Sequence, residues 1–140
     1  MSSIKELQEE IIDEFSMFED WMGKYEHLIE YGKSLSLLDD KFKTEEYEVR
    51  GCQAKVWLHT QITEGKLIFE ADSDAIITKG IIGLLVYVLS NHDVDEILET
   101  ELYFINEIGL REHLSPTRSN GLVSMIKQMK IYALGYKAKA

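Results

Sequence analysis

Residues 54–62 alternate strictly between apolar and polar side chains, which is the pattern of a β-strand with one buried face. The apolar face would consist of Ala54, Val56, Leu58, Thr60 and Ile62. Residues 63–66 predict a turn, where Gly65 takes a positive φ at little cost, and residues 67–71 predict the return strand. We therefore expect a β-hairpin with helices from elsewhere in the chain stacked on it.

A second, shorter alternation precedes this hairpin. Tyr47 and Val49 alternate with charged neighbours, which predicts a short strand that ends before Gly51. Together with the hairpin, this gives three antiparallel strands, with the single cysteine, Cys52, at the first connection.

Before the predicted strands, apolar residues recur at the spacing of an α-helix. The apolar stripe of an amphipathic helix consists of Ile4, Leu7, Ile11, Phe15, Phe18 and Met22. This pattern breaks near Gly23, and a second helical piece covers residues 25–31 and ends near Gly32. Residues 34–43 are expected to form an irregular linker.

Helices also follow the strands. Residues 75–90 are apolar on nearly all sides, which predicts a central buried helix with N-caps offered by Asp72, Ser73 and Asp74. Shorter helices are expected at 96–101 and 103–110. Ser115-Pro116 predicts the start of the last helix, which runs to about residue 134. Its inner stripe would be Leu122, Met125, Ile126, Met129 and Tyr132 or Ala133.

The order of elements and the length of 140 residues predict one domain, residues 1–140, of the α+β class. Its small three-stranded antiparallel sheet would have helices packed against it. No signal for a second domain or an internal repeat is present in the sequence.

The chain carries 15 Lys+Arg against 25 Asp+Glu, a net charge of −10. This excess of acids argues against nucleic acid or an anionic membrane as the main partner. The first predicted helix is strongly acidic, whereas five bases and no acids follow from Thr117 onward. Both ends of the chain are therefore candidate docking faces.

Neither a secretory leader nor a membrane span is predicted. The N-terminus has no basic region followed by an apolar run, and the most apolar stretch, residues 76–89, is too short to cross a bilayer. An unpaired cysteine in such a chain favours a reducing cytoplasm, and the mature form of an organelle-imported protein is the alternative.

Common catalytic and metal-binding motifs are absent from the sequence. It contains no phosphate-cradling glycine-rich loop and no Gly-x-Ser-x-Gly elbow. The four histidines lack metal-ligand spacing, and one cysteine cannot form a disulfide or a cysteine-based cluster site within the chain. We therefore predict neither a metal nor a resident cofactor.

Cys52 is the remaining candidate for chemistry. A lone cysteine is most often a small buried apolar group, but three features favour a reactive thiol. Gly51 allows the backbone beside the cysteine a wider range of conformations. Arg50 and Lys55 bring positive charge that favours the thiolate. Cys52 is an even number of residues before Val56, which would point the thiol toward the apolar side of the sheet edge. Without a second thiol to discharge it, a persulfide on this cysteine could be carried intact.

Three segments resemble the SufE family of sulfur acceptors, which includes the CsdE-type proteins. Residues 49–57, Val-Arg-Gly-Cys-Gln-Ala-Lys-Val-Trp, resemble the family's Val-x-Gly-Cys-Gln-Ser-x-Val-Trp segment, with Ala54 in place of the usual Ser. Residues 72–75, Asp-Ser-Asp-Ala, resemble the opening of its long helix. Residues 114–122, Leu-Ser-Pro-Thr-Arg-Ser-Asn-Gly-Leu, resemble its third motif.

The resemblance implies an α+β fold similar to that of IscU-type scaffolds. It also implies that a pyridoxal-phosphate cysteine desulfurase of the SufS or CsdA type presents a persulfide to Cys52. The sulfur would then pass to a SufBCD-type scaffold or another acceptor, for iron–sulfur cluster assembly. The pyridoxal cofactor would belong to the partner, so this chain is expected to be a sulfur-transfer partner and not to turn over a substrate alone.

The same resemblance assigns roles to four further residues. Arg118 would lie near the cysteine loop and help to hold the thiolate or persulfide, with a purely structural arginine as the alternative. Gly51 and Gln53 would shape the loop. Asp74 would contact the desulfurase or serve only as an N-cap. Trp57, on the other face of its strand, is expected to pack.

Two other functional classes stay open at this stage. A non-catalytic adaptor of the same fold would bind the desulfurase without carrying sulfur. A thiol-dependent enzyme would have a small substrate of its own, although the sequence shows no base or oxyanion motif to support it.

Overall fold

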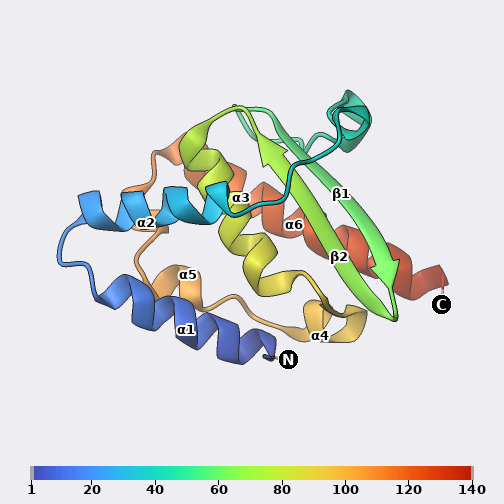
Figure 1. Ribbon diagram of the computed structural model, residues 1–140, viewed down its shortest axis with the longest axis horizontal. Coiled ribbons are helices and arrows are strands. Elements are labelled where there is room, and N and C mark those ends of the chain that lie inside the picture. The colour runs from blue at the N-terminus through green and yellow to red at the C-terminus, as the bar shows by residue number, and fades with distance from the viewer. Residues whose placement is uncertain (1, 140) are drawn as a thin grey trace.

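The computed structural model of the chain describes residues 2–139 and shows a long hairpin packed against a set of helices (Figure 1). The α-helices are α1 (Ile4–Ser16), α2 (Trp21–Lys33), α3 (Ile76–Leu89), α4 (Val94–Glu99), α5 (Phe104–Glu107) and α6 (Pro116–Lys139). The strands are β1 (Val56–Thr63), β2 (Lys66–Ser73) and β3 (His92–Asp93), and the 3₁₀ turns are η1 (Asp40–Phe42), η2 (Glu45–Tyr47) and η3 (Arg111–His113).

The sheet is antiparallel and has the order β1-β2-β3. Strands β1 and β2 pair over their full length, from Val56 opposite Ser73 to Thr63 opposite Lys66. The turn between them has positive φ at both Glu64 (φ 52°) and Gly65 (φ 81°), which matches the twist of the strands. The hairpin and its turn are therefore confirmed.

The third strand is not the one that the sequence predicted. Tyr47 lies in the η2 turn, and Glu48 forms only an isolated bridge with Trp57. The actual third strand is β3, which pairs with the start of β2. The predicted strand at 47–49 is wrong because this segment curls over the outer face of the sheet, where the Tyr47 ring packs edge-on against His59.

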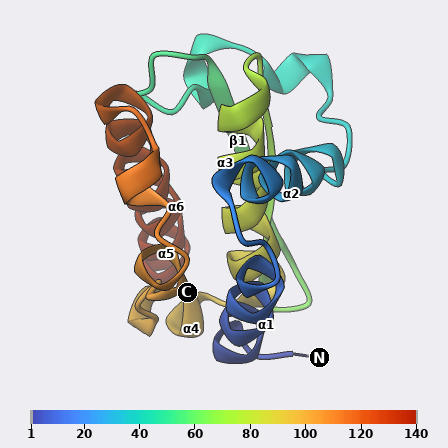
Figure 2. The same ribbon diagram turned by 90° about the vertical axis from the view of Figure 1, so that its left-hand side faces the viewer.

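Helix α3 occupies the centre of the fold. Figure 2 shows it between α6 on one side and α1 and α2 on the other, and its all-round apolar surface is largely buried as predicted. Glycines allow α2 and α3 to approach closely: a Cβ at Gly80 would lie 2.5 Å from the Leu28 carbonyl oxygen, and one at Gly83 would lie 2.5 Å from that of Tyr31.

The boundary between the first two helices lies earlier in the chain than the predicted break near Gly23. Helix α1 ends at Ser16, and α2 begins at Trp21 because the Asp20 side chain accepts a hydrogen bond from the Gly23 N–H at 2.9 Å. Met22 was predicted on the inner stripe of the first helix. It lies instead on α2 and is 73% exposed.

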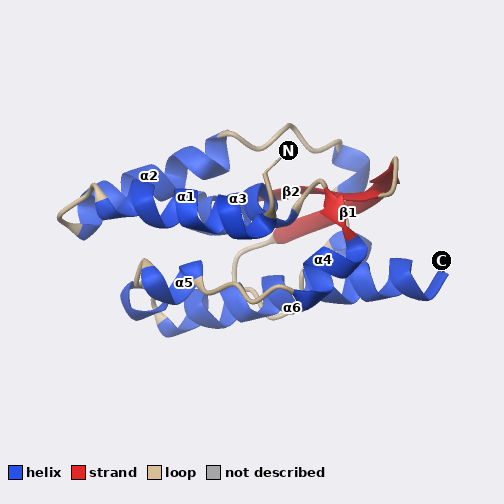
Figure 3. Cartoon of the chain, turned by 90° about the horizontal axis from the view of Figure 1, so that it is seen from below, coloured by secondary structure: helices blue, strands red, loops and turns tan. Residues whose placement is uncertain are grey.

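Helix α6 runs beneath the other helices along the length of the molecule (Figure 3). Ser115 caps it as predicted, because its Oγ accepts the Arg118 N–H at 3.3 Å. The buried face consists of Gly121, Leu122, Met125, Met129 and Ala133. The helix continues to Lys139, beyond the predicted end, and within residues 2–139 no helix has the length and apolarity to span a bilayer.

Candidate functional site

A loop of residues 50–55 carries the cysteine from the outer face of the sheet into β1. Gly51 adopts a φ of +95°, which a residue with a side chain rarely takes. A Cβ at this position would also collide with the Ser124 hydroxyl on α6. Both the backbone conformation and the close contact with Ser124 therefore favour glycine at position 51.

The Cys52 thiol faces helix α6 and is half-buried. Its Sγ donates a hydrogen bond to the Gly121 carbonyl oxygen at 3.6 Å. A Cβ at Gly121 would lie 3.4 Å from Sγ, so the glycine lets the loop approach the helix closely. The strand geometry begins only at Val56, so the predicted parity of Cys52 with β1 does not apply.

The ionisation of the thiol also differs from expectation. Burial raises the pKa of Cys52, and this is the opposite of the shift expected from Arg50 and Lys55. Both of those side chains are exposed to solvent, where their charge is screened. The protonated thiol is therefore the favoured form while the loop is closed against α6.

Cys52 opens onto a pocket of about 490 Å³. The pocket lies between the cysteine loop, α3 and the start of α6. Its lining consists of Cys52, Gln53, Ala54, Ala75, Thr78, Ile81, Ser115, Thr117, Arg118, Gly121 and Met125. The structure thus brings Cys52, Gln53 and Arg118 together, although 65 residues separate the last two along the chain.

A second hollow of about 360 Å³ lies on the other side of the same loop. It is lined by Glu45, Glu48, Val49, Arg50, Gly51 and Cys52. Cys52 therefore borders two cavities: one is lined by the carboxylates of Glu45 and Glu48, and the other is lined by no acidic residue among residues 2–139.

Asp74 holds the end of the loop and does not line the pocket. Its Oδ1 accepts the Lys55 N–H at 3.0 Å, and its own N–H donates to the Lys55 carbonyl oxygen at 3.2 Å. The N-cap position of α3 is Ala75, which provides no side-chain cap. The predicted N-cap role of Asp74 is therefore wrong, because the loop occupies its carboxylate.

Residues 9–133 match the SufE family, described as an Fe-S metabolism associated domain. The chain belongs to the SufE family. SufE-like protein 1, chloroplastic/mitochondrial, from Arabidopsis thaliana is 42% identical over 132 residues, which span 94% of this chain and 36% of that protein. An uncharacterized SufE-like protein from Rhizobium meliloti is 38% identical over 132 residues, which span 91% of this chain and 94% of the relative.

A solved structure supports the fold of this SufE family member. The solution structure of a hypothetical protein from Thermus thermophilus superposes with a TM-score of 0.76, at 21% identity, over 92% of this chain and 94% of that one. The likeness shows the shared α+β fold. Membership of the SufE family associates the chain with Fe-S metabolism.

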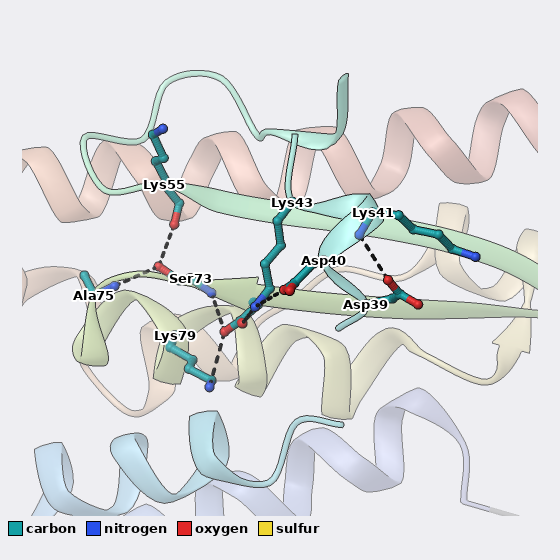
Figure 4. A network of polar contacts seen from close by, with 9 residues as sticks. Asp39, Asp40, Lys41, Lys43, Lys55, Ser73, Ala75 and Lys79 are labelled. Carbon is teal, nitrogen blue, oxygen red and sulfur yellow. Dashed lines mark hydrogen bonds and ion pairs between the residues drawn. The ribbon is translucent and has the colours of Figure 1, made fainter. Parts of the chain in front are cut away.

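A polar network anchors the segment that leads into the SufE cysteine loop (Figure 4). Asp72 pairs with Lys43 at 3.0 Å and with Lys79 at 3.2 Å. Burial raises the pKa of Asp72, but hydrogen bonds from Lys43, the Ser73 N–H and Lys79 outweigh this effect and lower the pKa. The network thereby ties residues 40–43 to both β2 and α3.

Aromatic rings fix the same segment on the outer face of the sheet. The Phe42 ring stacks on His59 with centroids 3.7 Å apart, and His59 Nδ1 lies 2.8 Å from a Glu70 carboxylate oxygen. Lys43 Nζ lies 5.9 Å from the Trp57 ring. Trp57 therefore packs against this segment, as the sequence predicted, and so does His59.

Sequence reasoning missed two pocket residues of this SufE family site, Thr78 and Gly121. Gly121 belongs to the third motif, but its closeness to Cys52 depends on a contact 69 residues apart. Thr78 was hidden within the apolar helix α3, where it is the only serine or threonine. Among residues 2–139, no group of three or more His, Cys, Asp or Glu could hold a metal ion.

Proposed function

We propose that this chain is a sulfur acceptor and activator of a pyridoxal-phosphate cysteine desulfurase of the SufS or CsdA type. Cys52 takes the sulfane sulfur as a persulfide and delivers it to a SufBCD-type scaffold or another acceptor for iron–sulfur cluster assembly. The observation that carries the proposal is the half-buried Cys52 thiol beside a pocket that contains Arg118. The SufE family match supplies the iron–sulfur context.

The transfer is a thiol–disulfide type of exchange. The Cys52 thiolate attacks the outer sulfur of the donor's persulfide, a new S–S bond forms on Cys52, and the donor cysteine leaves as a thiolate. No net oxidation occurs. The proton of Cys52 must leave first, and outward movement of the loop assists this because it restores water around the sulfur.

The closed loop suits the carrier step. With Sγ against Gly121, one side of the sulfur is covered by α6, which shields that side of a persulfide from solution thiols. Arg118 lines the same pocket as Cys52 and provides a positive charge for the anionic persulfide. The pyridoxal cofactor resides on the desulfurase, and a reducing compartment, such as the cytoplasm, keeps the single thiol free.

The acidic and basic ends of the chain are the candidate docking faces for these partners. Helix α1 has no basic residue in its last turn and exposes the acids Glu9, Glu10 and Asp13, whereas α6 ends in Lys137 and Lys139. Asp74, which is exposed beside the cysteine loop, would contact the desulfurase directly.

Mass spectrometry tests the acceptor role. The protein is incubated with a desulfurase and cysteine, and we expect Cys52 to gain the mass of one sulfur atom. Cys52→Ser should lose both the adduct and the stimulation of the desulfurase. If Cys52→Ser still stimulates the desulfurase, the chain is a binding adaptor and the acceptor role is refuted.

A further inference from the structure

The pocket beside Cys52 is lined by positive charge, although the chain as a whole is acidic. The chain contains 25 acidic residues, yet none lines the pocket, where Arg118 is the single charged side chain among residues 2–139. Arg118 is exposed, and its guanidinium makes no ion pair or side-chain hydrogen bond within residues 2–139. A cation without a protein partner in a cavity of this kind is available to a negatively charged ligand.

Thr78 provides a second, independent indication of a ligand. The residue is only 7% exposed, it lines the pocket, and its hydroxyl makes no hydrogen bond within residues 2–139. Among those residues, every polar side-chain atom that is closed off from solvent has a partner. The Thr78 hydroxyl therefore reaches the open volume of the pocket, where it can bond to a bound molecule.

The start of α6 adds to the same site. Ser115 and Thr117 line the pocket at the positive end of this 24-residue helix. Arg118, Thr78 and the helix end thus converge from α3 and α6 on one cavity, and all of them favour an anionic group.

The rest of the lining is apolar. Ile81 and Met125 are each 1% exposed and form the inner wall together with Ala54 and Ala75. A volume of about 490 Å³ falls within the range of small-molecule sites. A bare inorganic anion would leave most of this wall uncovered, whereas an organic acid with a short carbon chain would cover it.

We infer that this pocket binds a small thiol that carries a carboxylate or sulfonate group, and that such a thiol takes sulfane sulfur directly from Cys52. The acid group lies at Arg118, Thr78 and the start of α6, and the carbon chain lies on the apolar wall. The inference rests on the proposed persulfide at Cys52 and adds a small-molecule acceptor to it.

The transfer step balances without an oxidant or a reductant. The thiolate of the small molecule attacks the outer sulfur of the Cys52 persulfide, and a new S–S bond forms on the small molecule. The old S–S bond breaks, and Cys52 leaves with the electron pair as a thiolate. The products are the persulfide of the small thiol and unloaded Cys52.

The test uses the full chain without a desulfurase. Cys52 is loaded with one sulfur from inorganic polysulfide, and loading is checked by mass. Loss of that sulfur is then timed with 3-mercaptopropionate, 2-mercaptoethanesulfonate, neutral 2-mercaptoethanol and cationic 2-aminoethanethiol. A loaded peptide of residues 49–57, which lacks the pocket, corrects for the intrinsic reactivity of each thiol.

After this correction, we expect the two anionic thiols to saturate and to react about tenfold faster than the neutral thiol, since a charge-assisted hydrogen bond is lost without the acid group. Arg118→Gln should abolish this preference, and Thr78→Val should reduce it while keeping the side-chain volume. Arg111→Gln, an exposed arginine outside the pocket lining, is the matched control and should keep the preference.

The outcomes separate the two proposals. If Cys52 loads but the charge preference is absent, or survives in Arg118→Gln, the small-thiol site is refuted and the acceptor role stands. If sulfite removes the sulfur with saturation and the organic acids do not, the pocket is an inorganic-anion site and the inference is overturned. If Cys52 cannot be loaded, both proposals fail.

Discussion

The backbone of Lys55 is bonded twice to Asp74: its N–H donates to the carboxylate at 3.0 Å, and its carbonyl accepts the Asp74 N–H at 3.2 Å. A third bond, from the Ser73 hydroxyl to the Lys55 carbonyl at 2.8 Å, reinforces this junction. The end of the cysteine loop is thereby fixed to the start of α3. We expect this junction to restrain any outward movement of Cys52, because Lys55 lies only three residues after it along the chain.

Asp74→Ala should loosen the cysteine loop. Loss of one hydrogen bond of about 1 kcal/mol would raise the open population, and with it the alkylation rate of Cys52, by about fivefold. Asp74→Asn keeps the acceptor oxygen and should leave alkylation unchanged. Thiol alkylation kinetics check this, and equal rates in Asp74→Ala and the wild type would show that the bond does not restrain the loop.

The same pair of variants tests the docking role of Asp74. If its charge contacts the desulfurase, Asp74→Asn should weaken binding of the desulfurase while the thiol reactivity of the free protein stays normal. Calorimetric titration measures the binding. Unchanged affinity in Asp74→Asn would limit the residue to holding the loop.

Gly51→Ala should destabilise the fold more than Gly65→Ala. Both glycines have a positive φ, which costs an alanine about 1–2 kcal/mol, but only Gly51 faces a side chain, that of Ser124. At Gly65 a Cβ would meet no atom of residues 2–139 within 4 Å. Urea unfolding compares the two variants. An equal loss of stability would mean that the Ser124 side chain moves away from a Cβ at position 51 at little energetic cost.

The raised pKa of Cys52 predicts a pH-dependent contribution to stability. Because the folded pKa lies above the unfolded one, the stabilisation is fully present below the unfolded pKa and is lost as pH rises through the folded pKa. The free energy of unfolding of the wild type should therefore fall relative to Cys52→Ala between neutral and alkaline pH. If the free energies of unfolding of the two proteins change with pH in parallel, the pKa of the Cys52 thiol is not raised by folding.

Asp72→Asn should release the segment that leads into the cysteine loop. Asp72 is largely buried and paired with two lysines, so we expect a loss of about 1–2 kcal/mol. Asp93→Asn breaks the more exposed pair with Lys66 and should cost less than about 0.5 kcal/mol. Urea unfolding of both variants at neutral pH measures the difference.

The pH dependence of Asp72→Asn provides a check on the cause. Since its folded pKa is lowered, the stabilisation from Asp72 is present above the unfolded pKa and is lost as pH falls through the folded pKa. The gap between wild type and Asp72→Asn should therefore close in acid. A gap that persists at low pH would show that the loss comes from something other than the carboxylate charge.

Much of the fold could be predicted because its signals are local. The alternation at 54–62 with Gly65 determined the β1–β2 hairpin, the apolar run determined α3, and Ser115-Pro116 determined the start of α6. The third strand could not be predicted in this way. The strand His92–Asp93 is too short for a periodic pattern, and it pairs with β2 directly after Asn91, which has a φ of 66°.

The sequence by itself determined which atom is the candidate for chemistry, since one cysteine lies within a motif that resembles the SufE family, and the family match bears out that resemblance. Only the tertiary structure decided the environment of that atom. Helix α6 covers the thiol through Gly121, burial raises its pKa, and Thr78 joins Arg118 in the pocket. These properties depend on desolvation and on contacts between distant segments, which no local pattern of residues encodes.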